Sequence, residues 1–199
     1  MGMGSTAKRL DGKFTYEDYK TWPDEERWEV IDGGAYCMTP APSLQHQKIS
    51  GNFYSAFREF LKNKPCRPFY APTDVVLDEA NIVQPDVLVV CDPKKMEGLN
   101  ILGAPDLVVE ILSPSTRLKD KRDKKALYER FGVREYLIVY PEEEMVELFY
   151  LHDGLYASDV FNWDEKMVSR AFPELTVNLW EIFEKEVPQA EQSSDIAEP

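Results

Sequence analysis

The sequence predicts an α/β fold, with α+β character, in which one mixed β-sheet is flanked by helices. Apolar residues recur at helical spacing after Ser43, compact apolar runs of strand length follow, and a second helical segment separates them from two further runs. The order of one helix, three strands, one helix and two strands is typical of a layered α/β sandwich. With 199 residues and 43% hydrophobic content, the chain is long enough for one well-packed domain.

The N-terminal part predicts a short helix followed by a β-hairpin. Thr15 is a favourable N-cap for a helix in YEDYKTW, and Pro23 ends that helix. RWEVIDGGAYCM then predicts a strand through Glu29, a turn at residues 32–34 and a return strand.

The central part predicts a long helix and then three strands. One face of the helix between Ser43 and Pro65 is formed by Ile49, Phe53, Phe57, Phe60 and Leu61. Apolar runs predict strands at about 69–77, 86–91 and 105–112.

The second half predicts a helix at about 117–131, closed by Gly132, and strands at 135–140 and 145–151. A weaker strand (LYASDV) and a short helix after Asn178 complete the expected elements.

We expect a single domain at residues 14–187, between a flexible N-terminus (1–13) and a disordered polar tail (188–199). No apolar run approaches the roughly 20 residues that a membrane span needs, so no membrane partner is expected. The N-terminus lacks the apolar segment of a signal peptide. A cytoplasmic location is expected because the odd number of cysteines fits a reducing compartment.

Cysteine and histidine usage limits the kinds of metal site. Cys37, Cys66 and Cys91 are odd in number and form no CxxC pair, which argues against a disulfide framework or a thiolate zinc site. The chain has only two histidines, His46 and His152, so a multi-histidine site is excluded. Any metal ion should therefore be bound mainly by oxygen.

The charge distribution favours a focused phosphate site over an extended nucleic-acid groove. The chain carries a net charge of -13, whereas nonspecific nucleic-acid binding proteins are basic. Residues 117–130 are the exception, with seven Lys or Arg against three Asp or Glu. The sequence therefore places one basic helix on an acidic body.

Two carboxylates stand at apolar runs, Asp86 in VQPDVLVV and Glu110 in APDLVVEILSPST. An ionised carboxylate in such a run is costly unless a cation meets it, which points to a site for a hard metal ion and a phosphate. Asp86 follows Pro85, a residue type that marks the start of a strand or an edge strand. Its carboxylate could face a cleft or accept hydrogen bonds from local amides. Glu110 could alternatively pair with a structural Lys or Arg.

The helix that follows carries charged residues on its inward face. Leu127 and Phe131 mark this face, and steps of three and four residues place Lys124 and Asp120 on it. Lys125 lies about 100° away and is expected to face water. The alternative is a helix whose first turns overhang the core, with both charges at a wet rim.

Two further residues, His46 and Glu29, and the segment 113–116 could also belong to a site. His46 opens the first long helix and could be a proton donor, a phosphate contact or a surface histidine. Glu29 could supply another carboxylate near a metal ion, or could face solvent from its strand. The SPST segment at 113–116 predicts a turn and a helix N-cap, because no nucleophile-elbow motif accompanies its serines.

From about Tyr16 to Phe183 the chain resembles the Uma-two family of restriction endonucleases, within the PD-(D/E)XK nuclease superfamily. The matching stretches are RWEVIDG, MTPAPSLQHQ, PTDVVLDEANIVQPDVLVV, GAPDLVVEILSPST, GVREYLIV and the spacing Asp120–Lys124–Tyr128. The resemblance implies a restriction-endonuclease-like αβββαβ core.

The resemblance also implies the roles of individual residues. It implies Asp86 and Glu110 as acidic metal ligands, with Glu29 and His46 as accessory site residues. The superfamily's lysine stands two residues after the second acid, and here that position is Leu112. The resemblance implies that Lys124 of the following helix takes its place, in agreement with the inward face described above.

The predicted function is that of a metal-dependent endonuclease acting on DNA. Mg²⁺ or Mn²⁺ would be held by Asp86, Glu110 and the Ile111 carbonyl, with Lys124 stabilising the charge that develops on the phosphate. The main alternative is a non-catalytic module on the same scaffold that binds nucleic acid or protein. A glycosidase is disfavoured because its carboxylate pair needs no lysine. Cutting two strands favours a homodimer, with MVELFYL as the candidate exposed contact strand.

Overall fold

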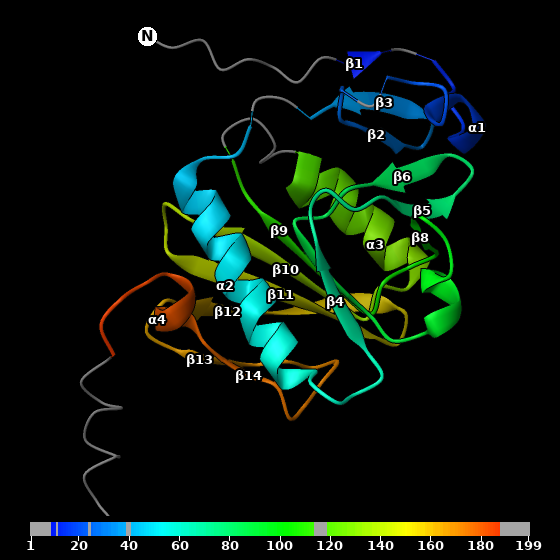
Figure 1. Ribbon diagram of the computed structural model, residues 1–199. Helices are drawn as coiled ribbons and strands as arrows, with labels where there is room; N and C mark the ends of the chain where they lie inside the picture. The colour runs from blue at the N-terminus through cyan, green and yellow to red at the C-terminus, as the bar shows by residue number, and fades with distance from the viewer. Residues whose placement is uncertain (1–8, 11, 24, 39–40, 114–118, 188–199) are drawn as a thin grey trace, which may run out of the picture.

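The computed structural model describes residues 9–10, 12–23, 25–38, 41–113 and 119–187 (Figure 1). The strands of one sheet are β1 (Arg9–Leu10), β2 (Trp28–Ile31), β3 (Gly34–Cys37), β5 (Val75–Asp78), β6 (Asn81–Val83) and β8 (Ile101–Leu102). Those of a second sheet are β4 (Arg67–Tyr70), β7 (Val87–Val90), β9 (Leu107–Ile111), β10 (Glu135–Tyr140), β11 (Met145–His152) and β12 (Leu155–Asn162). A small third sheet pairs β13 (Lys166–Val168) with β14 (Thr176–Asn178).

The helical elements come from five parts of the chain. They are α1 (Tyr16–Tyr19), α2 (Leu44–Phe60), the 3-10 helix η1 (Pro93–Met96), the π-helix η2 (Lys119–Lys124), α3 (Lys125–Phe131) and α4 (Leu179–Ile182).

The second sheet is mixed and lies between helices, as the sequence predicts. Its strand order is β12-β11-β10-β9-β7-β4, and only β9 and β10 run parallel among its pairs. Side chains of β7 alternate between the two faces. Val87 and Val89 pack with Phe53 of α2, whereas Leu88 packs with Leu127 of α3. Figure 1 shows α2 and α3 on opposite sides of this sheet.

The helix α2 is amphipathic because its apolar residues recur at spacings of four. Ile49, Phe53 and Phe57 are buried against the sheet, and the Ser43 side chain caps the helix N-terminus. Each fully buried phenylalanine contributes roughly 1.5–3 kcal/mol relative to an exposed one. The predicted helix after Ser43 is confirmed.

The N-terminal helix and hairpin are also confirmed. Thr15 and Asp18 form a capping box at α1, which ends at Tyr19 rather than continuing to Pro23. The strands β2 and β3 pair antiparallel around a turn in which Asp32 and Gly33 have φ of 49° and 78°. This left-handed backbone suits a glycine.

The single strand predicted at 69–77 is wrong. The chain leaves the second sheet after β4 and enters the first sheet at β5, with a cis peptide bond between Ala71 and Pro72 in the connection. Pro72 has no N–H to donate, so it interrupts a ladder that the apolar pattern alone would continue.

The helix predicted at 117–131 has two parts among the described residues. The π-helix η2 leads directly into α3, and Gly132 follows with φ of 75°, as expected of a residue that ends a helix. The N-cap predicted within SPST falls largely on residues 114–118, which lie outside the described residues. So does the predicted tail at 188–199, whereas Arg9 and Leu10 of the predicted flexible N-terminus pair with β3.

The prediction against a disulfide is wrong, since Cys66 and Cys91 are bonded to each other. β4 and β7 are antiparallel with Arg67 opposite Val90, and the next pair outward is therefore Cys66 and Cys91. Cysteine counting cannot reveal this proximity, because it arises from strand register.

The strand MVELFYL is not an exposed contact strand, so that prediction is wrong. Every residue of β11 from Met145 to His152 pairs with β12, and β10 lies on its other side. The edge of the sheet is β12, an eight-residue strand where the sequence predicts only a weak one. None of the described helices is sufficiently long and apolar to cross a lipid bilayer.

Candidate active site

The register between β7 and β9 brings Asp86 and Glu110 to the same end of the second sheet. Val87 lies opposite Val109 in this antiparallel pair, so the next positions outward are Asp86 and Glu110. The Asp86 Oδ2 atom accepts a hydrogen bond of 2.8 Å from the Ile111 backbone N–H. This bond crosses between the strands and fixes the Asp86 carboxylate beside Glu110.

Lys124 lies buried between two carboxylates from different strands. Its Nζ is 2.7 Å from Glu110 Oε1 and 2.8 Å from Glu29 Oε1. Glu29, Glu110 and Lys124 are only 0%, 3% and 1% exposed. The prediction that Lys124 faces inward is confirmed, and the interpretation of Glu29 as a solvent-facing residue is wrong.

The lysine is needed because buried charge is costly without a partner. Removing one member of a buried ion pair costs about 3–5 kcal/mol, since it leaves an uncompensated charge in the interior. Here one cation serves two carboxylates, Glu29 and Glu110. Replacing Lys124 would leave both of them without this counterion.

Neutral donors complete the environment of the two glutamates. The Tyr128 hydroxyl donates to Glu110 Oε1 at 2.8 Å, and the Gln84 backbone N–H donates to Glu29 Oε1 at 3.0 Å. Burial, followed by the negative charge of Glu110, raises the pKa of Tyr128 well above its ordinary value. Tyr128 therefore keeps its proton and acts as a donor that orients Glu110.

His46 approaches Asp86 from α2. It lies in the first turn of that helix, where its backbone N–H donates to Ser43 Oγ at 3.2 Å. The His46 Nε2 atom is 3.2 Å from Asp86 Oδ2. The residue is therefore not a remote surface histidine, and its ring lies within reach of a group held at Asp86.

The structure thus brings the predicted site residues together in two connected groups. One is His46 with Asp86, and the other is Lys124 with its two glutamates; the peptide between Glu110 and Ile111 joins them through its N–H bond to Asp86. Leu112, where the superfamily has its lysine, is buried in the apolar core. Lys124 supplies a cation to Glu110 from the helix instead.

The sequence reasoning gave no role to two site residues, although one of them, Tyr128, stands in the matching spacing Asp120–Lys124–Tyr128. Tyr128 lies one helical turn after Lys124, so the i,i+4 relation could have revealed it. No signal in the sequence marks Gln84, because its backbone N–H makes the contact. Lys125 is half-buried with its Nζ 4.3 Å from the Phe149 ring centroid, so the expectation that it simply faces water is wrong. The Asp120 side chain lies outside the described part.

The donor atoms at this end of the sheet suit a hard divalent ion. Among the described residues no three His, Cys, Asp or Glu side chains gather into a ready metal cage. Mg²⁺ does not need one, because it is commonly bound by one or two carboxylates and otherwise keeps water. Asp86 and Glu110, next to each other in the strand register, are the carboxylates that could hold such an ion.

The fold and the buried lysine between acidic residues define an α/β protein of the restriction-endonuclease-like class. The family model described as "Putative restriction endonuclease", Uma2, matches residues 16–179. The chain belongs to the Uma2 family. It is 30% identical over 145 residues to "Uncharacterized protein slr1290" of Synechocystis sp., covering 71% of this chain and 76% of that protein.

A solved structure has the same fold. The crystal structure of "a putative nuclease belonging to DUF820" from Anabaena variabilis superposes with a TM-score of 0.72 and 21% sequence identity. The match covers 86% of this chain and 98% of that one. The similarity therefore extends over the sheets and helices that position the site.

Proposed function

We propose that this protein is a metal-dependent endonuclease that hydrolyses phosphodiester bonds in DNA. The observation that carries the proposal is the buried Lys124, held between Glu29 and Glu110 beside Asp86. A cation and an acidic pair at one end of a sheet suit a phosphate and a hard metal ion. Membership of the Uma2 family, described as "Putative restriction endonuclease", supports a nuclease function.

Asp86, Glu110 and the Ile111 carbonyl would hold Mg²⁺ or Mn²⁺. When bound, such an ion polarises a phosphate oxygen and lowers the pKa of an attacking water. The protein's own residues then have separate tasks. Lys124 offers a fixed positive charge for the negative charge that develops on the phosphate, and Tyr128 orients Glu110.

His46 and Glu29 have supporting tasks in this proposal. His46 can hold a proton at Nε2 next to Asp86 and release it to a leaving oxygen. Glu29 fixes the position of the Lys124 ammonium, because Glu29 and Glu110 bind Nζ from two different strands. It is therefore a positioning residue, which acts through Lys124.

The test is nicking of supercoiled plasmid with Mg²⁺ or Mn²⁺, compared with the same reaction in EDTA. We expect cleavage only with the ion, and its loss in Asp86→Asn and in Glu110→Gln. Asp159→Asn is the matched control, because Asp159 lies on the edge strand β12 and forms an ion pair with Arg170. Cleavage by both site variants at the wild-type rate would refute the assignment.

A non-catalytic nucleic-acid- or protein-binding module on the same scaffold is the second candidate. The net charge of -13 favours it, because an acidic body opposes the approach of DNA. Binding to an oligonucleotide without cleavage under any of the metal conditions would support this second candidate. The cytoplasmic location and the homodimer expected from the sequence remain proposals as well.

A further inference from the structure

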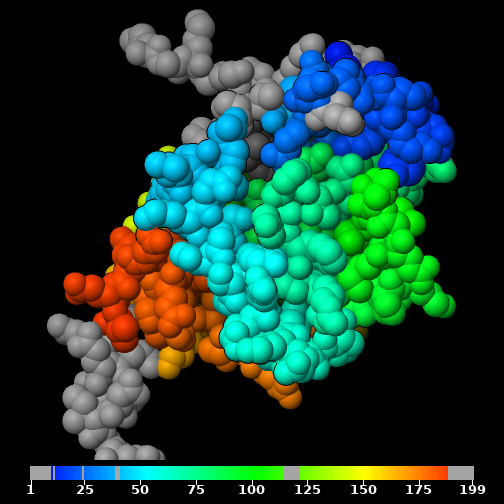
Figure 2. Space-filling model, in the orientation of Figure 1, coloured from blue at the N-terminus to red at the C-terminus, as the bar shows by residue number. Residues whose placement is uncertain are grey.

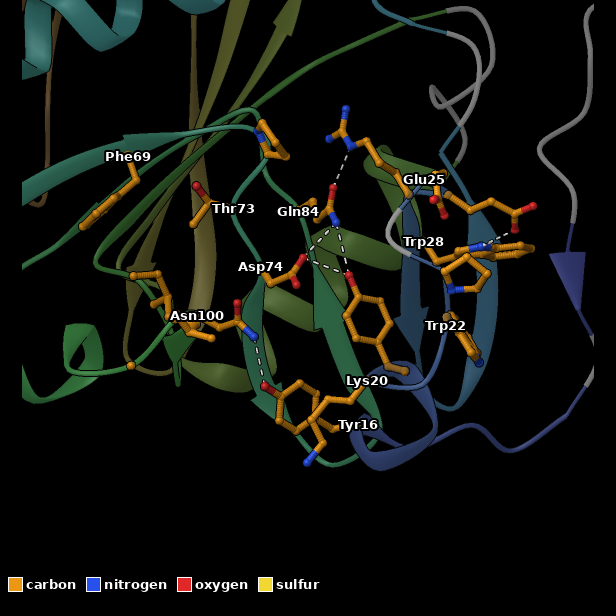
Figure 3. Close-up of a pocket in the computed structure, with 18 of the residues that line it drawn as sticks. Tyr16, Lys20, Trp22, Glu25, Trp28, Phe69, Thr73, Asp74, Gln84 and Asn100 are labelled. Atoms are coloured by element: carbon orange, nitrogen blue, oxygen red, sulfur yellow. Dashed lines mark hydrogen bonds between the residues drawn. The ribbon is translucent and has the colours of Figure 1, made fainter.

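A pocket of about 720 Å³ lies next to the acidic site, the group formed by Asp86, Glu110, Glu29 and Lys124 (Figure 3). The proposed function gives this pocket no task. One wall comes from the N-terminal residues between Tyr16 and Trp28. The other comes from the connection between β4 and β5 and from the segment between Met96 and Ile101. Both walls contribute to a single hollow, although they lie far apart in the sequence.

Aromatic rings line both walls of this pocket. Tyr16, Tyr19 and Trp22 stand on the N-terminal wall, and Phe69 stands on the opposite one (Figure 3). All four side chains are half-buried, so each retains some exposed surface. Flat aromatic surfaces around an open pocket suit a flat ring system as ligand, because stacking does not depend on the identity of the ring.

A hydrogen-bond network fixes the polar groups in the same pocket. Asp74 Oδ1 accepts from Tyr19 Oη at 2.9 Å and from Gln84 Nε2 at 2.8 Å. Arg27 Nε donates to Gln84 Oε1 at 2.8 Å. The second oxygen of Asp74 accepts no hydrogen bond from the described residues, so a fixed acceptor remains for a ligand.

The charges of the lining disfavour a phosphate as the group that fills the pocket. Lys20 and Arg27 are its cations, and Glu25, Glu26 and Asp74 are its carboxylates. A neutral aromatic ring with an amino group can stack on the aromatic side chains and donate a hydrogen bond to the remaining Asp74 oxygen. A nucleobase with an exocyclic amino group has this chemistry.

Gln84 connects the pocket to the acidic site. Its side chain belongs to the pocket network, whereas its backbone N–H binds Glu29, the partner of Lys124. Asp86 follows only two residues later, a distance of about 7 Å along an extended chain. One nucleotide with its base in the pocket would therefore place its phosphate near Asp86, whose side chain is partly exposed.

We propose that this pocket is a subsite for one unpaired nucleobase of the strand to be cut, with a preference for bases that carry an amino group. The inference rests on the proposed nuclease function and adds the form of its substrate. A base enters such a pocket from a single strand or after leaving the duplex stack. The enzyme therefore acts on unpaired or extruded nucleotides, which suits an acidic body that attracts duplex DNA poorly.

Strand binding in EDTA tests the subsite without cleavage. Trp22 and Trp28 line the pocket, so quenching of tryptophan fluorescence reports a stacked base. Oligo-dA and oligo-dC should bind about tenfold more tightly than an abasic strand of equal length, as stacking of one base predicts. Oligo-dT should bind less tightly than oligo-dA, because thymine lacks the amino group.

Asp74→Asn is the decisive variant, since it keeps the shape of the side chain. Its amide can still accept from Tyr19 at one atom and presents N–H in place of the second oxygen. The preference should therefore shift toward oligo-dT, while Asp159→Asn should bind all strands like the wild type. Equal binding of abasic and intact strands, or an unchanged base preference in Asp74→Asn, would overturn the proposal.

Further outcomes distinguish a strand from a free nucleotide as the source of the base, and the pocket proposal from the nuclease proposal. Free adenosine monophosphate that binds as tightly as oligo-dA would make the pocket an effector site and overturn the strand subsite. Base-dependent binding by a protein that never nicks plasmid would refute the nuclease while supporting the pocket. Nicking of plasmid without any base dependence of strand binding would support the nuclease and refute the pocket proposal.

Discussion

Lys124→Met should reduce the proposed nuclease activity and destabilise the fold, by two effects that can be separated. Methionine preserves most of the apolar stem and removes the ammonium group that contacts Glu29 and Glu110. The free energy of unfolding should fall by about 3–5 kcal/mol, because two buried carboxylates lose their cation. Such a loss is a large part of the 5–15 kcal/mol typical of a domain.

The rate of plasmid nicking should fall by about a hundredfold or more, as when one charge-stabilising group is lost. The assay is carried out with Mn²⁺ at fixed salt and at a temperature where urea unfolding shows that the variant is folded. Lys125→Ala is the control from the adjacent position, where the ammonium lies over Phe149. It should change the rate only slightly, through a phosphate attraction that fades with salt.

The double variant Glu29→Gln with Lys124→Met separates stability from catalysis. Removing one buried carboxylate together with the lysine should recover part of the lost stability, because less unpaired charge remains inside. Nicking should stay at the level of Lys124→Met if the ammonium acts on the phosphate. Recovery of nicking together with stability, or an equal loss in Lys125→Ala, would refute the catalytic role of Lys124.

Three other predictions concern the metal ion, pH and assembly. Calorimetric titration with Mn²⁺ should show weaker binding in Asp86→Asn and in Glu110→Gln, and wild-type affinity in both would remove them as ligands. Burial raises the pKa of Glu135 above its ordinary value of 4.5, although Ser169 and two backbone N–H groups oppose this. The contribution of Glu135 to the free energy of unfolding is therefore present below pH 4.5 and is lost as pH rises through its higher folded pKa. Glu135→Gln should remove this pH dependence of the free energy of unfolding, which urea unfolding at several pH values measures. Light scattering at tens of micromolar should give the mass of a dimer, and a monomeric mass would exclude a stable one.

The sequence predicts the positions of Lys124 and the two carboxylates because the signals for them are local. Helical periodicity from Leu127 and Phe131 places Lys124 toward the core, and the apolar runs place the two carboxylates on strands. The contact of Lys124 with Glu29 is not local, since these residues are far apart in the chain and meet only through packing of the first sheet against α3.

The features that the sequence misses depend on strand register and on changes of sheet. The disulfide between Cys66 and Cys91 follows from the pairing of β4 with β7, and the break at Pro72 follows from the passage between two sheets. The pocket beside Gln84 was not foreseen for the same reason. Its walls come from four separate segments, including Gln84, and the matching stretches RWEVIDG and PTDVVLDEANIVQPDVLVV that overlap them do not by themselves indicate a pocket.

The position of Lys124 on a helix rather than on β9 has a consequence for biosynthesis. A lysine two residues after Glu110 would stand beside it as soon as that strand forms, whereas Lys124 arrives only when α3 docks on the sheet. Nascent or partly unfolded chains that have the sheet but not the docked helix therefore lack the ammonium group. If Lys124 has the role proposed above, strand cutting and complete folding depend on the same ion pair, and incompletely folded chains are inactive.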